Sequence, residues 1–386
     1  MAMTLTGLVP TIYTALDVVS REQIGFIPNV QRDATAQSGA VGQTVRSPVV
    51  PAASLEDITA GNTPADSGDQ AIGYADVTIT NSKAYPIRWT GEEQLSVSQF
   101  GQYNTILADQ FSQGFRTIAN AVETDLAAMA KTRASRAYGT AGTTPFATAG
   151  DLTDLSEINR ILDDNGAPPT DRVMIINSAS RAKLEGKHSE LFKVNEAGDA
   201  GAMLRQRQMR QLQNFTMGFS GQVKVHTPGT AAGYAVDLLA GYAPGTTTIH
   251  LDTGTGTHVS GDVITFAGDP NRYVIRTGAA AGGDKDIVIA APGLRLALAD
   301  GVLGPIAAAY TANMAFSSNA LVLATRVPAM PDGGDDADDV ELITDPVSGL
   351  VFQVAMYRQY RRVKYEVALA WGAHAIKPEH LALLLG

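Results

Sequence analysis

The residues that could do chemistry in this sequence are spread along the chain rather than gathered in motifs. A zinc site on one face of a helix needs two histidines four positions apart, and no two histidines here have that spacing. We therefore interpret each histidine as a surface or hydrogen-bonded residue, and we predict no metal site. The histidines are His188, His226, His250, His258, His374 and His380.

Carboxylates are abundant, but their local patterns favour structural roles. Asp163 and Asp164 come directly before Asn165-Gly166, which is typical of a helix end and a turn rather than of an acid/base pair. Residues 331–339 offer oxygen ligands of the kind that calcium prefers, but their spacing is not that of an EF-hand, so we favour a solvated acidic loop. Its aspartates are Asp332, Asp335, Asp336, Asp338 and Asp339.

Other catalytic signatures are missing from the sequence. Residues 254–259 begin like a dinucleotide-binding fingerprint but lack its last glycine, and there is no G-x-S-x-G motif. Cysteine is absent, which excludes disulfides, thiol nucleophiles and zinc–thiolate sites. We predict no catalytic residue, no cofactor-binding residue and no cofactor, and we expect that the protein is not an enzyme.

The charge of the chain disfavours tight binding to nucleic acid. Its 386 residues carry a formal net charge of −10, whereas proteins that hold DNA by counterion release need a basic surface. Four basic residues do gather near the end of the chain, and they could contact nucleic acid or an acidic partner; we favour ion pairs with the abundant Asp and Glu. The four are Arg358, Arg361, Arg362 and Lys364.

Neither a membrane span nor a secretion signal is expected. No apolar run approaches the roughly 18 residues that a bilayer crossing requires. Residues 1–17 lack a basic n-region and already contain Asp17, so they make a poor signal peptide.

The strongest structural pattern is a long helix over residues 100–129. Its large apolar residues recur at gaps of three or four, which predicts one stripe over about eight turns, where an average helix has about three. The stripe consists of Phe100, Tyr103, Leu107, Phe111, Phe115, Ile118, Val122, Leu126 and Met129. Thr90 and Glu93 form a capping box before it, and Gly139 is a plausible stop.

The segments before this helix have the pattern of extended arms rather than of a folded domain. Residues 10–24 fit a short helix, and residues 26–44 are polar and irregular. Period-two alternation then predicts extended strands at 46–53, 75–80 and 85–89, in a long hairpin-like loop with a turn-rich tip. A lone two-stranded ribbon is marginal in water, so we expect this loop to lie on a neighbouring molecule.

The rest of the chain alternates helices and strands around a small all-β module. A helix at 151–164, a buried strand at 172–177 and a helix from residue 178 indicate an α/β region. From 229 to 313 short strands alternate with Gly, Asp and Pro turns, which suggests an inserted barrel-like module. Long strands follow, and the final residues 378–386 are predicted to form a short helix.

This order of parts resembles the major capsid protein of tailed bacteriophages, with the Hong Kong 97-type fold, in the podovirus coat subfamily that carries an inserted β-domain. The resemblance covers nearly the whole chain. It rests on LTGLVPTIYTALDVVSREQIGFIPNV, YPIRWTGEEQLSV, FSGQVKVHTPGT, SGDVITFAGDPNRYVI, NMAFSSNALVLATRVPAMP and TDPVSGLVFQVAMYRQY, which occur in this order.

The resemblance implies an α+β fold with an N-arm, an E-loop, a long spine helix, P- and A-domains and an inserted small β-barrel domain. The expected parts are the N-arm (1–44), the E-loop and its strands (45–91), the spine helix and P-domain (92–150), the first part of the A-domain (151–228), the inserted barrel (229–318) and the closing strands of the A- and P-domains (319–386).

The resemblance also implies a function. A major capsid protein self-assembles into the icosahedral shell around a double-stranded DNA phage genome, by way of a scaffolded procapsid. The implied partners are many copies of the chain itself in hexamers and pentamers, a scaffolding protein, a portal protein and a decoration protein, with no membrane and no sequence-specific DNA binding. The implied location is the virion, after assembly in the bacterial host cytoplasm.

Candidate interface residues lie in the arm and at the end of the extended loop. The scaffold contact implied by the subfamily falls on Asp17, Arg21 and Glu22, and the full set is Ile12, Leu16, Asp17, Arg21, Glu22, Tyr85, Ile87 and Trp89. Two alternatives stay open. One is an encapsulin-like nanocompartment shell, whose subunits are usually shorter and lack an insertion. The other is a hydrolase with a β accessory domain that uses two carboxylates about 5 to 10 Å apart.

Overall fold

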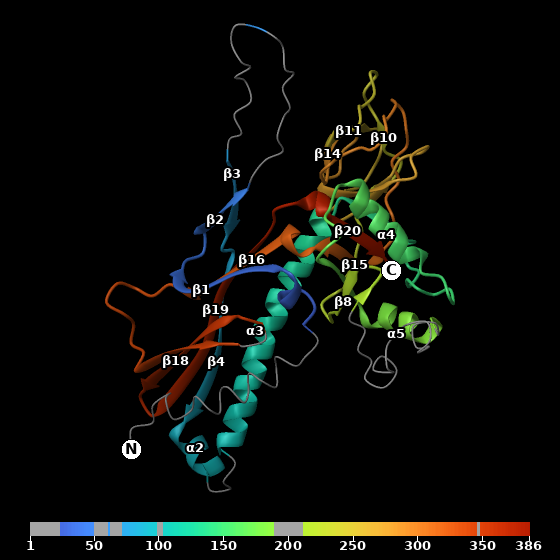
Figure 1. The fold of residues 1–386 in the computed structure, drawn as a ribbon. Coiled ribbons are helices and arrows are strands. Elements are labelled where there is room, and N and C mark those ends of the chain that lie inside the picture. The colour runs from blue at the N-terminus through green and yellow to red at the C-terminus, as the bar shows by residue number, and fades with distance from the viewer. Residues whose placement is uncertain (1–23, 50–60, 62–71, 99–102, 189–210, 346–347) are drawn as a thin grey trace.

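The computed structural model describes residues 24–49, 61, 72–98, 103–188, 211–345 and 348–386. Its organising element is helix α3 (Tyr103–Arg133), whose 31 residues span about 46 Å. Figure 1 shows α3 running diagonally through the molecule, with one sheet along its lower left flank and the second sheet at its upper end. The predicted stripe is confirmed from Leu107 to Leu126, because every large apolar residue in that interval is buried.

The first sheet packs against α3. Its strands run in the order β1 (Gln31–Gly39), β16 (Leu321–Pro328), β19 (Arg362–Ala375), β18 (Val351–Gln359) and β17 (Asp339–Thr344), and β4 (Asn81–Thr90) also pairs with β19. Rings from the helix meet rings from the sheet edge-on: Phe111 contacts Tyr365 at 5.8 Å and Phe115 contacts Phe352 at 5.0 Å between ring centroids. This apolar layer fixes the helix along the sheet.

Helix α2 (Gly91–Ser98) precedes α3 and begins at the predicted capping box. The Thr90 backbone N–H donates to the Glu93 carboxylate at 2.9 Å, and the Glu93 N–H donates to the Thr90 hydroxyl at 3.3 Å. These reciprocal bonds satisfy two backbone donors and confirm the capping box.

The second sheet lies beside the far end of α3. Its central strands are β5 (Arg136–Tyr138), β20 (Leu381–Leu385), β15 (Tyr310–Ser317), β6 (Arg172–Ile176) and β8 (Phe215–Phe219), and the short strands β7 (Gln211–Leu212) and β9 (Val225–His226) pair with β8 and β15. Helices α4 (Thr153–Asp164) and α5 (Ser178–Lys187) were both predicted, and the buried face of α4 is Leu155, Ile158, Ile161 and Leu162.

The β-module has its own apolar core. Its strands are β10 (Ala235–Val236), β11 (Thr248–Asp252), β14 (Lys285–Ile289), β13 (Arg272–Thr277) and β12 (Val263–Thr265), in that spatial order. The segment 302–307 hydrogen-bonds to β10 on one side and to β12 on the other, so the backbone pairing returns to its starting strand. Strand β15 lies outside this ring, in the second sheet, although the expected insertion runs to residue 318.

Three predictions about local structure were wrong. Residues 31–39 are not irregular but form β1, which pairs in parallel with β16. Helix α3 ends at Arg133, and Gly139 lies beyond the short strand β5 instead of stopping the helix. The end of the chain is not a helix: a 3-10 turn (Pro378–His380) leads into β20, whose five residues are all buried.

Candidate assembly surface

Five of the predicted interface residues lie outside the described residues. They are Ile12, Leu16, Asp17, Arg21 and Glu22, and their assignment stays a prediction.

The other three predicted residues lie on β4, and they face α3 of the same chain. Ile87 is 3% exposed and Trp89 is 7% exposed. The Trp89 indole donates to Gln110 Oε1 at 2.8 Å. The half-buried ring of Tyr85 lies over Gly114, where an added Cβ would come within 2.8 Å of it. These side chains therefore join the strand to the helix and leave little area for another copy.

A two-stranded ribbon projects beyond the first sheet, above its upper edge in Figure 1. Strands β2 (Thr44–Val49) and β3 (Gly73–Thr78) pair only with each other among the described strands. Ile72 is 63% exposed and Tyr74 is 60% exposed, and the Arg46 guanidinium lies 5.1 Å from the Tyr74 ring centre. At the Ile72–Tyr74 end the ribbon presents apolar side chains that no described part of the chain covers, and such an uncovered strand edge can pair with another molecule.

The root of the ribbon is fixed firmly to the body. Val77 is fully buried against Val322 and the neighbouring Ala324 of β16. The Thr80 N–H donates to the carbonyl of Trp371 at 3.1 Å, and a Cβ on Gly372 would lie 2.0 Å from the Thr78 carbonyl oxygen. Only glycine permits this close approach, so the direction in which the ribbon leaves the sheet is set by packing.

A second exposed surface lies where the β18–β19 turn meets the start of α2. Tyr360 at the turn is 92% exposed, and the Gly91 N–H donates to the Arg361 carbonyl at 3.1 Å. A shallow hollow of about 590 Å³ lies here, lined by Thr90, Gly91, Glu92, Gln359, Tyr360, Arg361 and Arg362.

Two members of the basic cluster at this turn pair within the chain. The Arg358 side chain lies 4.0 Å from Asp338, whose carboxylate also accepts the Arg358 N–H at 2.7 Å, and Lys364 pairs with Glu366. The ion-pair interpretation of the cluster therefore has direct support at Arg358 and Lys364.

A buried carboxylate on α3 anchors the start of the described chain. Glu123 is 1% exposed and accepts backbone N–H groups from Gly25, Phe26 and Ile27, together with the hydroxyl of Ser220. Burial raises the pKa of this carboxyl group, and the four donors act in the opposite direction. The first described residues are thus fixed to the long helix through one buried side chain.

A second polar cluster anchors the β-module at its root. Asp262 is fully buried and accepts from His226 Nε2 at 2.9 Å, from the Gly229 N–H at 3.1 Å and from the Val259 N–H at 2.8 Å. The other ring nitrogen of His226 lies 3.2 Å from the ammonium of Lys131 on α3. This chain of contacts links the long helix to the point at which the chain enters the module.

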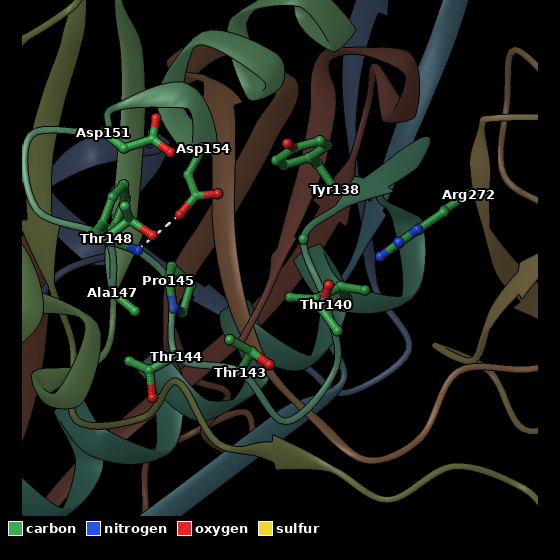
Figure 2. Close-up of a pocket in the computed structure, with 13 residues that line it drawn as sticks. Tyr138, Thr140, Thr143, Thr144, Pro145, Ala147, Thr148, Asp151, Asp154 and Arg272 are labelled. Carbon is green, nitrogen blue, oxygen red and sulfur yellow. Dashed lines mark hydrogen bonds between the residues drawn. The ribbon is translucent and has the colours of Figure 1, made fainter.

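A polar pocket of about 230 Å³ lies beside α4, and two carboxylates line it. Figure 2 shows these two residues, Asp151 and Asp154, on one side of the pocket. Asp154 accepts the Phe146 N–H at 2.8 Å, and Asp151 accepts the Thr153 N–H at 2.9 Å. The bonds from Thr153 lower the pKa of Asp151. Asp151 thus holds a backbone donor at the first residue of α4, and Asp154 holds one in the loop before it, so both carboxylates have structural partners.

Asp163, Asp164 and Asp335 also have structural partners. Asp163 and Asp164 pair with the buried side chains of Arg172 and Arg136 at 2.6 and 3.0 Å. In the acidic loop, Asp335 accepts the Tyr357 hydroxyl at 2.7 Å. Sequence reasoning missed Glu123 and Asp262, since their donors lie in distant segments and neither residue stands in a recognisable motif.

Within the described residues, none of the helices combines the length and the apolar content that a bilayer crossing requires.

Comparison with solved structures finds similar chains that are mostly phage capsids. A chain of the capsid of the cyanophage P-SCSP1u is 13% identical with a TM-score of 0.47, over 91% of this chain and 86% of that one. A chain from Mycobacterium phage Che8 is 15% identical with a TM-score of 0.46, over 89% and 84%. A virus-like particle from Pyrococcus furiosus is 9% identical with a TM-score of 0.45, over 97% and 98%.

No family model and no curated protein matches the sequence. The three TM-scores all lie below 0.5.

Proposed function

We propose that this chain is a major capsid protein with a Hong Kong 97-type fold and an inserted small β-barrel, and that many copies assemble into an icosahedral shell around double-stranded DNA. The observation that carries the proposal is the β2–β3 ribbon. It is rigidly rooted at Gly372, yet it presents Ile72 and Tyr74 to solvent and lacks a third strand among the described residues. Such a ribbon is marginal alone and gains stability when another copy covers it.

The long helix suits the same role. A helix of about 46 Å that is buried along one face by a sheet gives a subunit length and stiffness without thickness, which is what a thin shell wall needs. The net charge of −10 fits a shell whose inner surface does not hold DNA tightly. We propose a scaffolding protein, a portal and a decoration protein as further partners, no enzymatic activity, and assembly in a bacterial cytoplasm.

The test is to express the full chain, with and without a co-expressed scaffold, and to measure particle size by light scattering and electron microscopy. The wild-type chain is expected to form large closed particles. The double substitution Ile72→Asp with Tyr74→Asp should leave a soluble, folded chain that does not assemble, because charges on the ribbon oppose its burial.

Leu239→Asp is the matched control, since Leu239 is also exposed but lies on the β-module. It should assemble as the wild type does. A wild-type chain that stays a small monodisperse oligomer under every condition would overturn the proposal, and so would a ribbon variant that assembles normally.

A nanocompartment shell remains the second candidate, because a covered ribbon serves any closed shell. The β-module favours the phage shell, since nanocompartment subunits usually lack an insertion. The contents of particles isolated from the natural source decide: DNA supports the phage shell, and an enclosed enzyme supports the compartment.

A further inference from the structure

One group of side chains on the β-module has no part in the proposed assembly. His250 lies on β11, where Ile249 and Leu251 point into the core and His250 therefore points outward. Asp286 on β14 is its cross-strand partner, and Asp237, directly after β10, donates its N–H to the His250 carbonyl at 3.1 Å. Asp284 directly precedes β14. Three neighbouring strands, seen together at the top of Figure 1, thus bring these residues to one face.

The imidazole of His250 is held in a defined orientation. Its Nδ1 lies 2.7 Å from Asp286 Oδ1, and its Nε2 faces Asp284 Oδ1 at 2.6 Å and Asp237 Oδ2 at 3.9 Å. The three ligand atoms of Asp237, His250 and Asp284 all lie within 4.8 Å of one another. An imidazole that is fixed by a carboxylate through one nitrogen and directed at further ligands through the other is the usual arrangement of a metal-binding histidine.

We propose that Asp237, His250 and Asp284 bind a divalent transition metal of the Zn²⁺ type, with Asp286 as the residue that orients His250. An imidazole nitrogen with carboxylate oxygens suits Zn²⁺ or Mn²⁺, whereas Ca²⁺ and Mg²⁺ prefer oxygen ligands throughout. With bonds of about 2.0 to 2.2 Å, tetrahedral ligands stand roughly 3.3 to 3.5 Å apart. The distances from His250 Nε2 to Asp284 Oδ1 and Asp237 Oδ2, 2.6 and 3.9 Å, lie on either side of this range. The side chains of Asp237 and Asp284 are 54% and 78% exposed, so they have room to adjust.

The local charges favour a cation at this position. Three carboxylates surround one imidazole, so the group stays negative in either protonation state of the ring. Lys285 is adjacent in sequence but points into the module, where its ammonium donates to the carbonyls of Gly256 and Ala280. A divalent ion would neutralise the excess negative charge. It would also connect the segment after β10 to the turn before β14, and so stiffen this end of the module.

The acidic loop at 331–339 is a useful contrast. It holds more aspartates, but Asp335 and Asp338 already accept bonds from Tyr357 and Arg358, and no histidine is directed at them in the described structure. The proposed site is distinguished by its oriented imidazole rather than by its number of acids.

The experiment titrates Zn²⁺ into the chelator-treated full chain by isothermal titration calorimetry, with Mg²⁺ as the comparison ion. We expect one Zn²⁺ per chain and no measurable Mg²⁺ binding. His250→Gln and Asp284→Asn should weaken Zn²⁺ binding at least 10-fold, and Asp286→Asn should weaken it about 10-fold through lost orientation. Asp336→Asn, an exposed aspartate of the acidic loop, is the control and should bind as the wild type does.

The metal-free melting temperature of each variant shows that folding is unchanged, since the replaced side chains are partly or well exposed. Equal Zn²⁺ affinity in the wild type and in His250→Gln would overturn the proposal, because it would mean general association with an acidic surface. Stoichiometry well below one per chain would overturn it too. The result does not depend on whether the chain forms a shell.

Discussion

Glu123 on the long helix accepts the backbone N–H of Ile27 at 2.7 Å, although the two residues lie 96 positions apart in the chain. The same carboxylate also holds Phe26, Gly25 and Ser220. One buried side chain thus fixes both the beginning of the described chain and the turn at Ser220 to the middle of α3.

Glu123→Ala is expected to lower the free energy of unfolding by about 3 kcal/mol, since it leaves several buried backbone donors without an acceptor. Glu123→Gln keeps one oxygen for Phe26 and Ile27 and should cost only about 1 kcal/mol. Urea unfolding of the two variants measures the difference. Equal losses would show that the carboxylate does not serve as the acceptor we describe.

Phe111→Asp should reduce stability by about 4 kcal/mol or more, because it removes a fully buried ring and places a charge in the layer between α3 and β19. Soluble yield and the urea midpoint provide the measurement. Asn120→Asp puts the same charge on the exposed face of the same helix and should change stability by less than about 0.5 kcal/mol. A soluble Phe111→Asp chain with wild-type stability would contradict the packing of the helix.

Gly372→Ala should loosen the root of the ribbon, because its Cβ would lie 2.0 Å from the Thr78 carbonyl oxygen. We expect a loss of about 1 to 3 kcal/mol and faster hydrogen exchange at the Thr80 amide, which donates to Trp371. Gly282→Ala is the control, since an added Cβ there meets nothing within 4 Å. Unchanged exchange at Thr80 in Gly372→Ala would show that the close approach does not hold the ribbon.

His258 makes the stability of the β-module depend on pH. The residue is 3% exposed, both ring nitrogens lack a hydrogen-bond partner in the described structure, and burial lowers its pKa to about 4. The unfolded chain, with a histidine pKa near 6.5, therefore takes up a proton before the folded chain does. The contribution of His258 to the free energy of unfolding is therefore fully present above about pH 6.5. It falls by up to about 3 kcal/mol as the pH drops towards 4.

The measurement is urea unfolding of the wild type and of His258→Leu between pH 7 and pH 4. The difference in stability between the two proteins should shift in favour of the leucine variant as the pH falls. A difference that stays constant over this range would mean that the folded and unfolded chains protonate His258 alike.

Local sequence patterns predicted the helices well, because each depends on neighbours within one or two turns. The stripe of α3, the buried face of α4 and the capping box at Thr90 are all of this kind. Strand β1 was missed because QRDATAQSG has no apolar alternation, and it is ordered by backbone pairing with β16, almost 300 residues away. The terminal LALLL is a short apolar run that fits a helix or a strand equally well. It forms a strand because it pairs with β5 and β15 on its two sides.

The candidate site was harder to predict than the fold. Alternation along β4 identifies Ile87 and Trp89 as apolar, but it does not say whether the same chain or another copy covers them; the structure shows that α3 does. The orientation of the His250 imidazole depends on Asp286 of β14 and on Asp237 and Asp284, which lie just after β10 and just before β14, and spacing along the sequence does not reveal these contacts.

Strand β5 follows α3 within three residues and pairs with β20 on one side and β13 on the other. The β-module is therefore joined to the second sheet through hydrogen-bonded backbone as well as through its two covalent connections. A module attached in this way does not swing independently, so any tilt of it moves the far end of the long helix. In the shell that we propose, a change in the tilt of the module would therefore be passed on to the second sheet through β5.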